Sequence, residues 1–387
     1  MSDEFILKKQ GGPIPVLILD LISYCNYSCI MCPQSKINEN ETFRGVMDFK
    51  LYKSIIDELC TPPQKARVII PFWNGEPTLY PKFKEALEYA AKKKKEFPQA
   101  WEVWSLHTNF SLIDEDLART IIRSELFGPI TVSLDAIKTD SYSKIRVGGK
   151  RDEVYENIKR FIKIRQELGK EFPSLTIQFI VQDQNIDEVE EFVAFWKDEF
   201  SKYGIEPKMI KDEAEGMEKD TIYIRRLIAN TGKEQPMYDD LHKKALIKVG
   251  LINEMTDEQI VKHAEYIEEE ENVNTDLKQD NTNKPEKKRR EPCVGLWQHF
   301  GIRFDGETSA CCIDFRCEQS LGNIKDKGFF AIWNSKKLMD YRFYHLKGDF
   351  KNIKICSTCR NQPFGALNYE LLDLWLESVG KKDDFDI

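Results

Sequence analysis

Three cysteines near the start of the chain constrain its fold and chemistry more than any other feature. Cys25, Cys29 and Cys32 follow the spacing C-x3-C-x2-C. Thiolates at this spacing can hold three irons of a four-iron cluster from one short loop, and no fourth cysteine is close enough in sequence to bind the last iron. The alternative is a structural zinc site, which needs four closed ligands. The motif therefore predicts a cluster with one iron open to another ligand.

Strand-like and helix-like segments alternate with short joints from residue 16 to about residue 210. This alternation is typical of a parallel sheet with crossover helices, and the cysteine loop directly follows the first strand, 16–22. Six β/α units are too few for a complete eight-fold barrel. We expect further strands at 67–72, 101–106, 130–134, 175–181 and 205–210, with helices at 47–60, 81–97, 115–125, 154–168 and 189–200.

Residues at the ends of these strands are candidate site residues, because barrels keep their chemistry at the C-terminal ends of their strands. A glycine lets the backbone approach a ligand, and a carboxylate accepts hydrogen bonds from an ammonium group. An arginine fork suits a carboxylate, although surface ion pairs and tight turns use the same residue types. The candidates are Asn74-Gly75-Glu76-Pro77, Asn109, Ser133, Arg146 and Gln178.

At these positions the sequence resembles the radical SAM superfamily. The resemblance rests on the cysteine spacing, on Gly75-Glu76-Pro77, on His107-Thr108-Asn109, and on Ser133-Leu134-Asp135 followed by Lys144-Ile145-Arg146. Phe110 departs from the family pattern, because it replaces a glycine and suggests a less open turn. The resemblance implies an α/β fold with a partial (β/α)6 TIM-like barrel. It also implies that Cys25, Cys29 and Cys32 bind a 4Fe-4S cluster whose open iron chelates S-adenosylmethionine.

The same resemblance implies which side chains contact S-adenosylmethionine. In the family the Gly-Glu-Pro segment holds the amino group of the methionine moiety. By likeness Ser133 contacts the ribose or carboxylate, and Arg146 pairs with the carboxylate. A polarizable thioether can lie against the adenine ring, and a residue on the fifth strand can line the pocket floor. The expected contacts are Met31, Asn74, Gly75, Glu76, Pro77, Asn109, Ser133, Arg146 and Gln178.

The composition changes sharply after the last expected barrel strand. Segment 211–291 contains four consecutive glutamates, an almost apolar-free stretch at 272–283 and a basic run at 284–290. Such charge blocks cannot bury enough apolar surface to order themselves, although the earlier part keeps some helical character. We expect a charged, partly helical or disordered insert or linker, with a helical lid or partner site as the alternative. The expected parts are 1–210, 211–291 and 292–387.

Six cysteines occur in the last hundred residues. Cys293 and Cys311 flank an Asp-Gly hairpin turn, and Cys356 and Cys359 form a C-x2-C pair. The pattern resembles the SPASM or twitch extension of radical SAM enzymes, which implies a small α+β domain with auxiliary four-iron clusters. Six cysteines are too few for two fully cysteine-bound clusters, so we expect one. Its expected ligands are Cys293, Cys311, Cys356 and Cys359, with Cys312 as the alternative to Cys311.

Two alternatives remain open in this C-terminal part. A four-cysteine zinc site fits the terminal C-x2-C pair equally well. Cys312 and Cys317, the cysteines left over, are candidate hydrogen-atom donors or inert small side chains. A helix at 367–379 is expected to cap the domain.

The overall composition limits the cellular compartments and the classes of partner that we expect for this protein. The net charge is −8 with interspersed charges of both signs, which argues against a general nucleic-acid binder. The sequence has neither a signal-peptide pattern nor a run of apolar residues long enough to span a membrane. Cysteines at metal-ligand spacings are typical of a reducing compartment, so we expect a cytoplasmic protein.

The resemblance also implies the reaction class. A flavodoxin- or ferredoxin-type donor reduces the cluster, S-adenosylmethionine is cleaved to a 5′-deoxyadenosyl radical, and this radical abstracts a substrate hydrogen atom. Oxidation or crosslinking follows from electron loss to the auxiliary cluster, and epimerisation follows from hydrogen return by a thiol. Few residues precede Cys25, whereas many peptide maturases carry an N-terminal leader-binding domain. We therefore expect a small sugar- or aminocyclitol-like substrate, with a ribosomal peptide or a non-catalytic electron carrier as alternatives.

Overall fold

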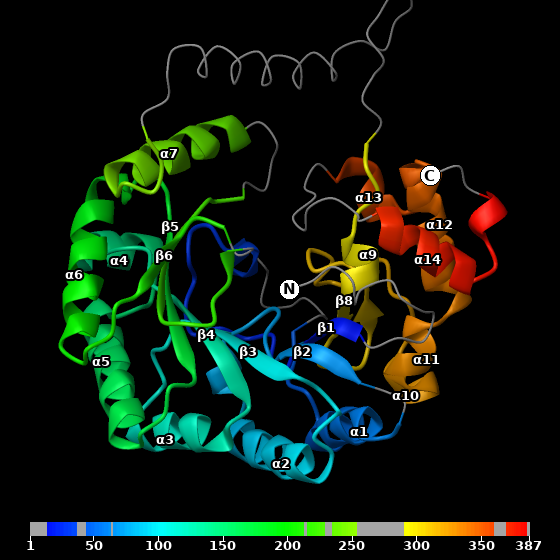
Figure 1. Ribbon diagram of the computed structural model, residues 1–387, viewed down its shortest axis with the longest axis horizontal. Helices are drawn as coiled ribbons and strands as arrows, with labels where there is room; N and C mark the ends of the chain where they lie inside the picture. The colour runs from blue at the N-terminus through cyan, green and yellow to red at the C-terminus, as the bar shows by residue number, and fades with distance from the viewer. Residues whose placement is uncertain are drawn as a thin grey trace, which may run out of the picture.

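The computed structural model in Figure 1 describes residues 14–36, 44–62, 65–212, 215–228, 234–253, 290–359 and 369–384. Within these ranges, nine strands form one sheet in the order β6-β7-β5-β4-β3-β2-β1-β8-β9. Every pairing is parallel except β8 with β9. The strands line the inside of an open barrel, and helices α1 to α6 cover its outside (Figure 1). The expected α/β partial barrel is therefore confirmed.

The strand and helix bounds follow the expected alternation closely in the first two hundred residues. The strands are β1 Ile14–Leu19, β2 Ala66–Ile70, β3 Val103–Thr108, β4 Phe127–Ser133, β5 Ser174–Ile180, β6 Lys208–Ile210, β7 Thr221–Arg225, β8 His299–Ile302 and β9 Thr308–Ser309. The barrel helices are α1 Phe49–Leu59, α2 Phe83–Glu96, α3 Glu115–Ser124, α4 Thr139–Ile145, α5 Arg151–Glu167, α6 Val189–Ser201 and α7 Gln235–Lys248. The C-terminal helices are α9 Gly295–Gln298, α10 Ile324–Lys327, α11 Phe329–Trp333, α12 Lys336–Leu346, α13 Lys354–Thr358 and α14 Tyr369–Ser378.

Local sequence explains where two of the barrel helices, α1 and α3, begin. The Asp48 carboxylate accepts hydrogen bonds from the amides of Lys50 and Leu51, and this satisfies donors that the first turn of α1 leaves open. Asp114 caps α3 in the same way through the Leu117 amide. Each helix then buries one apolar face against the sheet. In α1 this face consists of Leu51, Tyr52, Ile55, Ile56 and Leu59.

The inner face of the barrel sheet is polar where β3, β4, β5 and β7 lie side by side. Strand register places four polar residues in one row, His107, Thr131, Thr176 and Thr221. A second row, two residues closer to the C-terminal ends, contains Ser133, Gln178 and Tyr223. The positions between these rows face the helices and are apolar, as in Val132, Ile177 and Ile222. The barrel therefore turns hydroxyl and amide groups toward its interior.

Two features of the sheet differ from the expected order. The strand beside β5 is β7, and the short expected strand at 205–210 forms β6 on the outer side of β7. Strand β7 and helix α7 lie inside the charged segment 211–291, whose residues 254–289 fall outside the described ranges. The division of the chain at residues 210 and 291 stays a prediction.

The C-terminal part is joined to the barrel through both the sheet and a helix. Strand β8 pairs in parallel with β1, so the barrel sheet continues into this part. The Glu58 carboxylate at the end of α1 accepts hydrogen bonds from the amides of Phe329 and Phe330, at 3.2 and 3.0 Å, where α11 begins. Helices α11 and α12 are separate, because α11 ends before Ser335 caps α12. No described helix is long and apolar enough to cross a membrane.

Replacing Glu58 with alanine should lower the free energy of unfolding by about 1–2 kcal/mol, because two helix-end amides lose a charged acceptor. Urea denaturation followed by circular dichroism would measure the change. Glu88→Ala is the matched control, since Glu88 is exposed on helix α2. Equal stability of the two variants would show that Glu58 does not join the two parts.

Candidate functional site

The cysteine loop lies at the C-terminal end of β1, where the sequence places it. Cys29 is buried, Cys32 is half-buried and Cys25 is exposed. Backbone hydrogen bonds hold the loop against the segment after α4: the Ser28 amide donates to Val147 at 2.8 Å and the Ile30 amide donates to Ile145 at 3.1 Å. The loop is therefore fixed by the main chain and leaves its thiols available as ligands.

The three thiols lie close enough to influence one another. Desolvation raises the pKa of Cys25 to about 12, and negative charge on Glu76, Cys29 and Cys32 would raise it further. Desolvation also raises the pKa of Cys32. Cys25 and Cys32 therefore hold their protons in the absence of metal, so iron binding must release them. These two thiols suit a cationic metal group better than they suit free thiolates.

The Gly-Glu-Pro segment packs directly on the cysteine loop. A Cβ atom at Gly75 would lie 2.3 Å from the carbonyl oxygens of both Ile22 and Tyr24. The next amide, that of Glu76, donates to the Tyr24 carbonyl at 2.9 Å. Only glycine allows this close approach of two backbones. The segment and the loop therefore form one rigid unit at the barrel mouth.

The Glu76 carboxylate is buried and bound by protein donors. It accepts hydrogen bonds from the Thr78 amide and hydroxyl at 3.2 and 2.6 Å, from the Thr108 hydroxyl at 2.7 Å and from the Asn109 amide at 2.8 Å. Burial raises its pKa, and these hydrogen bonds act in the opposite direction. Three of the four bonds end on Oε1, so Oε2 keeps acceptor capacity for a ligand. Glu76 thus ties the end of β3 to the cysteine loop.

A Glu76→Gln variant should lose about 1–3 kcal/mol of unfolding free energy, because one acceptor oxygen becomes an NH2 group that faces a buried donor. Chemical denaturation would report the loss. Glu102→Gln is the matched control, since Glu102 forms a partly exposed ion pair with Arg67 at 3.2 Å. A loss no larger than that of the control would contradict the tying role of Glu76.

The segment after β3 also reaches the cysteine loop. The Asn109 side-chain amide donates to Asn26 at 2.9 Å and lies 4.0 Å from the Cys25 sulfur. Phe110, which replaces the glycine of the family pattern, keeps a left-handed backbone with φ of 64°. Its ring is fully buried and packs edge-on against Phe161. The turn therefore keeps the glycine-like conformation, and burial of the ring offsets the backbone strain.

Arg146 lies between Asp135 and the cysteine loop. Its guanidinium pairs with the fully buried Asp135 and approaches the Cys29 sulfur at 3.6 Å. Asp135 also accepts from the Ile180 amide at 2.8 Å. Sequence reasoning identified Arg146 and missed Asp135 as its partner. Its position could have indicated this role, because Asp135 is among the first residues after β4, at the end of the barrel where site residues are expected.

The other expected contacts lie around the same mouth. Ser133 and Gln178 are register partners on β4 and β5, and Gln178 accepts a hydrogen bond from Arg225 on β7 at 3.0 Å. The Asn74 backbone amide donates to Asp20 at 3.2 Å. Met31 is half-buried in the cysteine loop, and Pro77 begins a short 3-10 helix. Asp20 and Arg225 were missed: Asp20 directly follows β1, whereas Arg225 lies on an unexpected strand.

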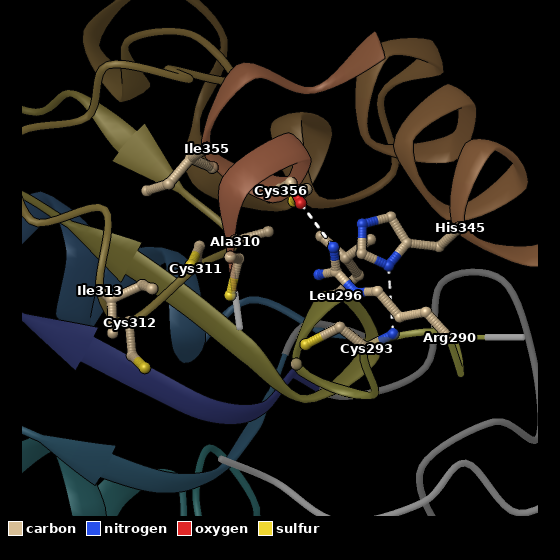
Figure 2. A pocket seen from close by; sticks show the side chains of 12 residues that line it. Arg290, Cys293, Leu296, Ala310, Cys311, Cys312, Ile313, His345, Ile355 and Cys356 are labelled. Carbon is tan, nitrogen blue, oxygen red and sulfur yellow. Dashed lines mark hydrogen bonds between the residues drawn. The ribbon is translucent and has the colours of Figure 1, made fainter. Parts of the chain in front are cut away.

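Five C-terminal cysteines surround one pocket, which Figure 2 shows from close by. Cys293 precedes α9, Cys311 and Cys312 follow β9, and Cys356 and Cys359 lie in and after α13. The space, including its open mouth, is about 450 Å³. All four expected auxiliary ligands line it, together with Cys312. Cys317, which is buried with φ of 54°, is not among the lining residues.

The chemistry of this pocket fits an iron–sulfur cluster. Burial raises the pKa of Cys312 and of Cys356 to about 12 and raises the pKa of Cys293 and Cys311 as well. In the described ranges no three His, Cys, Asp or Glu side chains converge closely enough for one metal ion. The cysteines therefore surround a space and do not meet at a point.

Hydrogen bonds join the segment before Gly-Glu-Pro to the loop that follows β9. The indole N–H of Trp73 donates to the Cys312 carbonyl at 2.7 Å, and the Asn74 side chain donates to the Phe315 carbonyl at 3.3 Å. A Cβ at Gly301 would lie 2.5 Å from the Trp73 ring, so this glycine makes room for the indole. Trp73 and Asn74, which precede Gly-Glu-Pro, thus contact the main chain of the loop that contains Cys312.

Comparison with known proteins finds two family models along this chain. Residues 20–196 match the model of the radical SAM superfamily, and residues 293–360 match the SPASM model, described as an iron–sulfur cluster-binding domain. A tungsten-containing aldehyde ferredoxin oxidoreductase cofactor-modifying protein of Pyrococcus furiosus is 26% identical over 46% of this chain and 47% of the relative. A GTP 3′,8-cyclase of Clostridium botulinum is 25% identical over 53% of this chain and 59% of the relative. The chain spans about half the length of these curated relatives.

Solved structures share the fold along most of the chain. SuiB of Streptococcus suis bound to S-adenosylmethionine has a TM-score of 0.52 at 16% identity and covers 86% of this chain and 68% of its own. The protein anSMEcpe with bound AdoMet has a TM-score of 0.54 at 17% identity, with coverage of 97% and 96%. The description of residues 293–360 as iron–sulfur binding decides against the zinc alternative. The chain therefore carries a radical SAM domain over residues 20–196 and a SPASM domain over residues 293–360, and these two domains imply S-adenosylmethionine, a 4Fe-4S cluster and an auxiliary iron–sulfur cluster as its cofactors.

Proposed function

We propose that this chain oxidises or epimerises a small hydroxylated substrate, similar to a sugar or an aminocyclitol, at a carbon–hydrogen bond. When bound, the cofactors would supply radical chemistry for removal of a substrate hydrogen atom, through reductive cleavage of S-adenosylmethionine. Cys25, Cys29 and Cys32 would hold the first cluster. Cys293, Cys311, Cys356 and Cys359 would hold the auxiliary one.

The observation that carries the substrate class is the polar inner face of the barrel. Hydroxyl, amide and imidazole groups of β3, β4 and β5 form its rows, and the Thr131 and Thr176 hydroxyls have no hydrogen-bond partner within the described structure. Burial lowers the pKa of His107 to about 4, with a further contribution from Arg225, so its imidazole is neutral at pH 7. Neutral donors and acceptors suit the hydroxyl groups of a sugar-like molecule.

The chain's own residues would position S-adenosylmethionine and limit its contact with water. Gly75 allows close backbone approach, and Glu76 keeps acceptor capacity on Oε2 for an ammonium group. Arg146 would serve the carboxylate from its place beside Asp135 and Cys29. Met31, Asn74, Pro77, Asn109, Ser133 and Gln178 complete the proposed contacts.

Peptide or protein maturation is the second candidate function. SuiB, which shares the fold, has been solved with its precursor peptide SuiA, and the Pyrococcus relative is named as a cofactor-modifying protein. Epimerisation would need a hydrogen-atom donor, and Cys312 in the auxiliary pocket is the better placed of the two spare cysteines. A non-catalytic electron carrier is the third candidate, and it needs neither Gly75-Glu76-Pro77 nor Ser133 and Arg146.

The cellular setting belongs to the same proposal. Most of the ten cysteines stand at metal-ligand spacings, which fits the reducing cytoplasm. The electron that starts the reaction would come from a flavodoxin- or ferredoxin-type donor, as the resemblance to the radical SAM superfamily implies. General nucleic-acid binding and membrane association are not part of the proposed activity.

The deciding experiment follows deuterium into 5′-deoxyadenosine by mass spectrometry. The reduced protein is incubated with S-adenosylmethionine and carbon-deuterated sugars or aminocyclitols, and in parallel with deuterated peptides. Label from a hydroxylated small molecule would support the proposal. Label only from peptides would favour maturation, and absence of any S-adenosylmethionine cleavage by the reduced protein would favour the electron carrier.

A further inference from the structure

His345 occupies an unusual position in the auxiliary pocket. It lies in the last turn of α12, is 1% exposed and lines the pocket together with the five cysteines. Its Nδ1 accepts a hydrogen bond from the Cys293 amide at 3.1 Å, which Figure 2 marks with a dashed line. The ring therefore contacts the main chain of an expected cluster ligand.

This hydrogen bond fixes the tautomer of the ring. An Nδ1 atom that accepts a hydrogen bond carries no hydrogen, so the imidazole is neutral and its hydrogen lies on Nε2. Nε2 is buried and has no hydrogen-bond partner within the described structure. A buried donor without a partner destabilises the folded protein, so the unpaired Nε2–H of His345 points to a ligand.

Neighbouring side chains hold the ring in this orientation. The Phe350 ring packs edge-on against His345 with centroids 4.9 Å apart, and the Arg290 guanidinium lies 4.2 Å from the centroid of the same Phe350 ring. Arg290 also donates to the Cys356 carbonyl at 2.6 Å. Arg290, Phe350 and His345 thus connect the main chains of Cys293 and Cys356, which come from opposite ends of the domain.

We propose that His345 is a positioning residue of the auxiliary cluster: its Nδ1 orients Cys293, and its Nε2–H donates a hydrogen bond to a cluster sulfur. Hydrogen bonds to the sulfurs of an iron–sulfur cluster stabilise the more negative, reduced state and raise the reduction potential. The role rests on the iron–sulfur assignment of the domain and is independent of the substrate. Failure of the sugar-like substrate proposal would therefore leave it unaffected.

The two nitrogens of His345 can be tested separately. Asparagine places an acceptor near the position of Nδ1 and removes the distal donor, whereas glutamine places a donor near the position of Nε2. The measurement uses the full-length chain with Cys25, Cys29 and Cys32 replaced by alanine, so that only the auxiliary cluster contributes. The cluster is titrated under anaerobic conditions and followed by its visible absorption and its electron paramagnetic resonance.

We compare the variants at the potential where the auxiliary cluster of the parent protein is half reduced. There we expect His345→Asn to raise the ratio of oxidised to reduced cluster about tenfold, which equals a reduction potential lower by about 59 mV for a one-electron couple. His345→Gln should stay within about threefold of the parent ratio, since it restores a distal donor. An Asn variant that titrates like the parent protein would overturn the proposal. Equal shifts in the Asn and Gln variants would also overturn it, because a general disturbance of the pocket would then explain both.

A second measurement does not depend on cluster loading in any His345 variant. The same Cys25, Cys29 and Cys32 alanine chain is prepared with 15N-labelled histidine, and pulsed electron paramagnetic resonance is recorded on its reduced auxiliary cluster. His345 is the only histidine that lines the pocket within the described residues. A weak histidine nitrogen coupling that changes with the label would support the hydrogen bond, and the absence of any such coupling would contradict it.

Discussion

A Cys29→Ala variant should lose reductive cleavage of S-adenosylmethionine to background and keep the auxiliary cluster. Cys29 is the buried member of the N-terminal trio, and Arg146 contacts its sulfur at 3.6 Å. Two remaining thiolates on a short loop cannot hold a four-iron cluster that three held. Iron and sulfide analysis should therefore show a loss of about half of the bound iron. Liquid chromatography of 5′-deoxyadenosine after chemical reduction measures the activity.

Cys60→Ala is the matched control for this experiment. Cys60 is also a buried cysteine, but it lies at the end of α1 in the apolar core. Its replacement removes a sulfur without touching either pocket, so both iron content and cleavage should stay at the level of the unaltered protein. Full cleavage by the Cys29→Ala protein would mean that the N-terminal trio does not bind the cluster.

The parts of the fold that sequence predicts well are those with local signals. The alternation of buried strands and amphipathic helices from β1 to α6 depends on residues close in sequence. The cysteine loop and the Gly-Glu-Pro segment were placed correctly because each directly follows a strand. The closeness of these two segments also followed, since the C-terminal ends of neighbouring parallel strands meet at one edge of a barrel.

The parts that sequence does not predict depend on partners far apart in the chain. Strand β7 lies in a charged segment, and its place beside β5 follows from register, which local periodicity does not show. The pairing of β1 with β8 joins Val16 to His299. The Asp135 and Arg146 pair was missed for a related reason, because each residue alone fits an ordinary exposed position. Tertiary contacts determine the place of β7, the pairing of β1 with β8 and the pair of Asp135 with Arg146.

His345 shows the same limit in the auxiliary domain. A histidine on a helix gives no signal in the sequence, and only the fold brings its ring against the Cys293 amide. The cysteine pattern, by contrast, predicted four side chains that line one pocket. The choice between Cys311 and Cys312 stays open to experiment, because both thiols line that pocket.

A Gly75→Ala variant should bind S-adenosylmethionine about 10- to 100-fold more weakly than the unaltered protein. The added Cβ would lie 2.3 Å from two carbonyl oxygens of the cysteine loop, and backbone atoms cannot move aside as a flexible side chain can. Relief requires the Gly-Glu-Pro segment to separate from the loop, which breaks the bond between the Glu76 amide and Tyr24. Overpacking of this kind also costs about 1–3 kcal/mol of stability.

Gly204→Ala separates the local effect of Gly75→Ala from a general loss of stability. Gly204 has φ of 69° and open space around the position of a Cβ atom, far along the chain from the loop. Alanine there should cost about 1–2 kcal/mol through backbone strain alone. Equilibrium binding of labelled S-adenosylmethionine to reconstituted protein should then be unchanged, because the barrel mouth stays intact. If both variants lost affinity equally, contact between the two segments would have no special role; a loss confined to Gly75→Ala would show that the joined backbone of loop and segment builds the cofactor site.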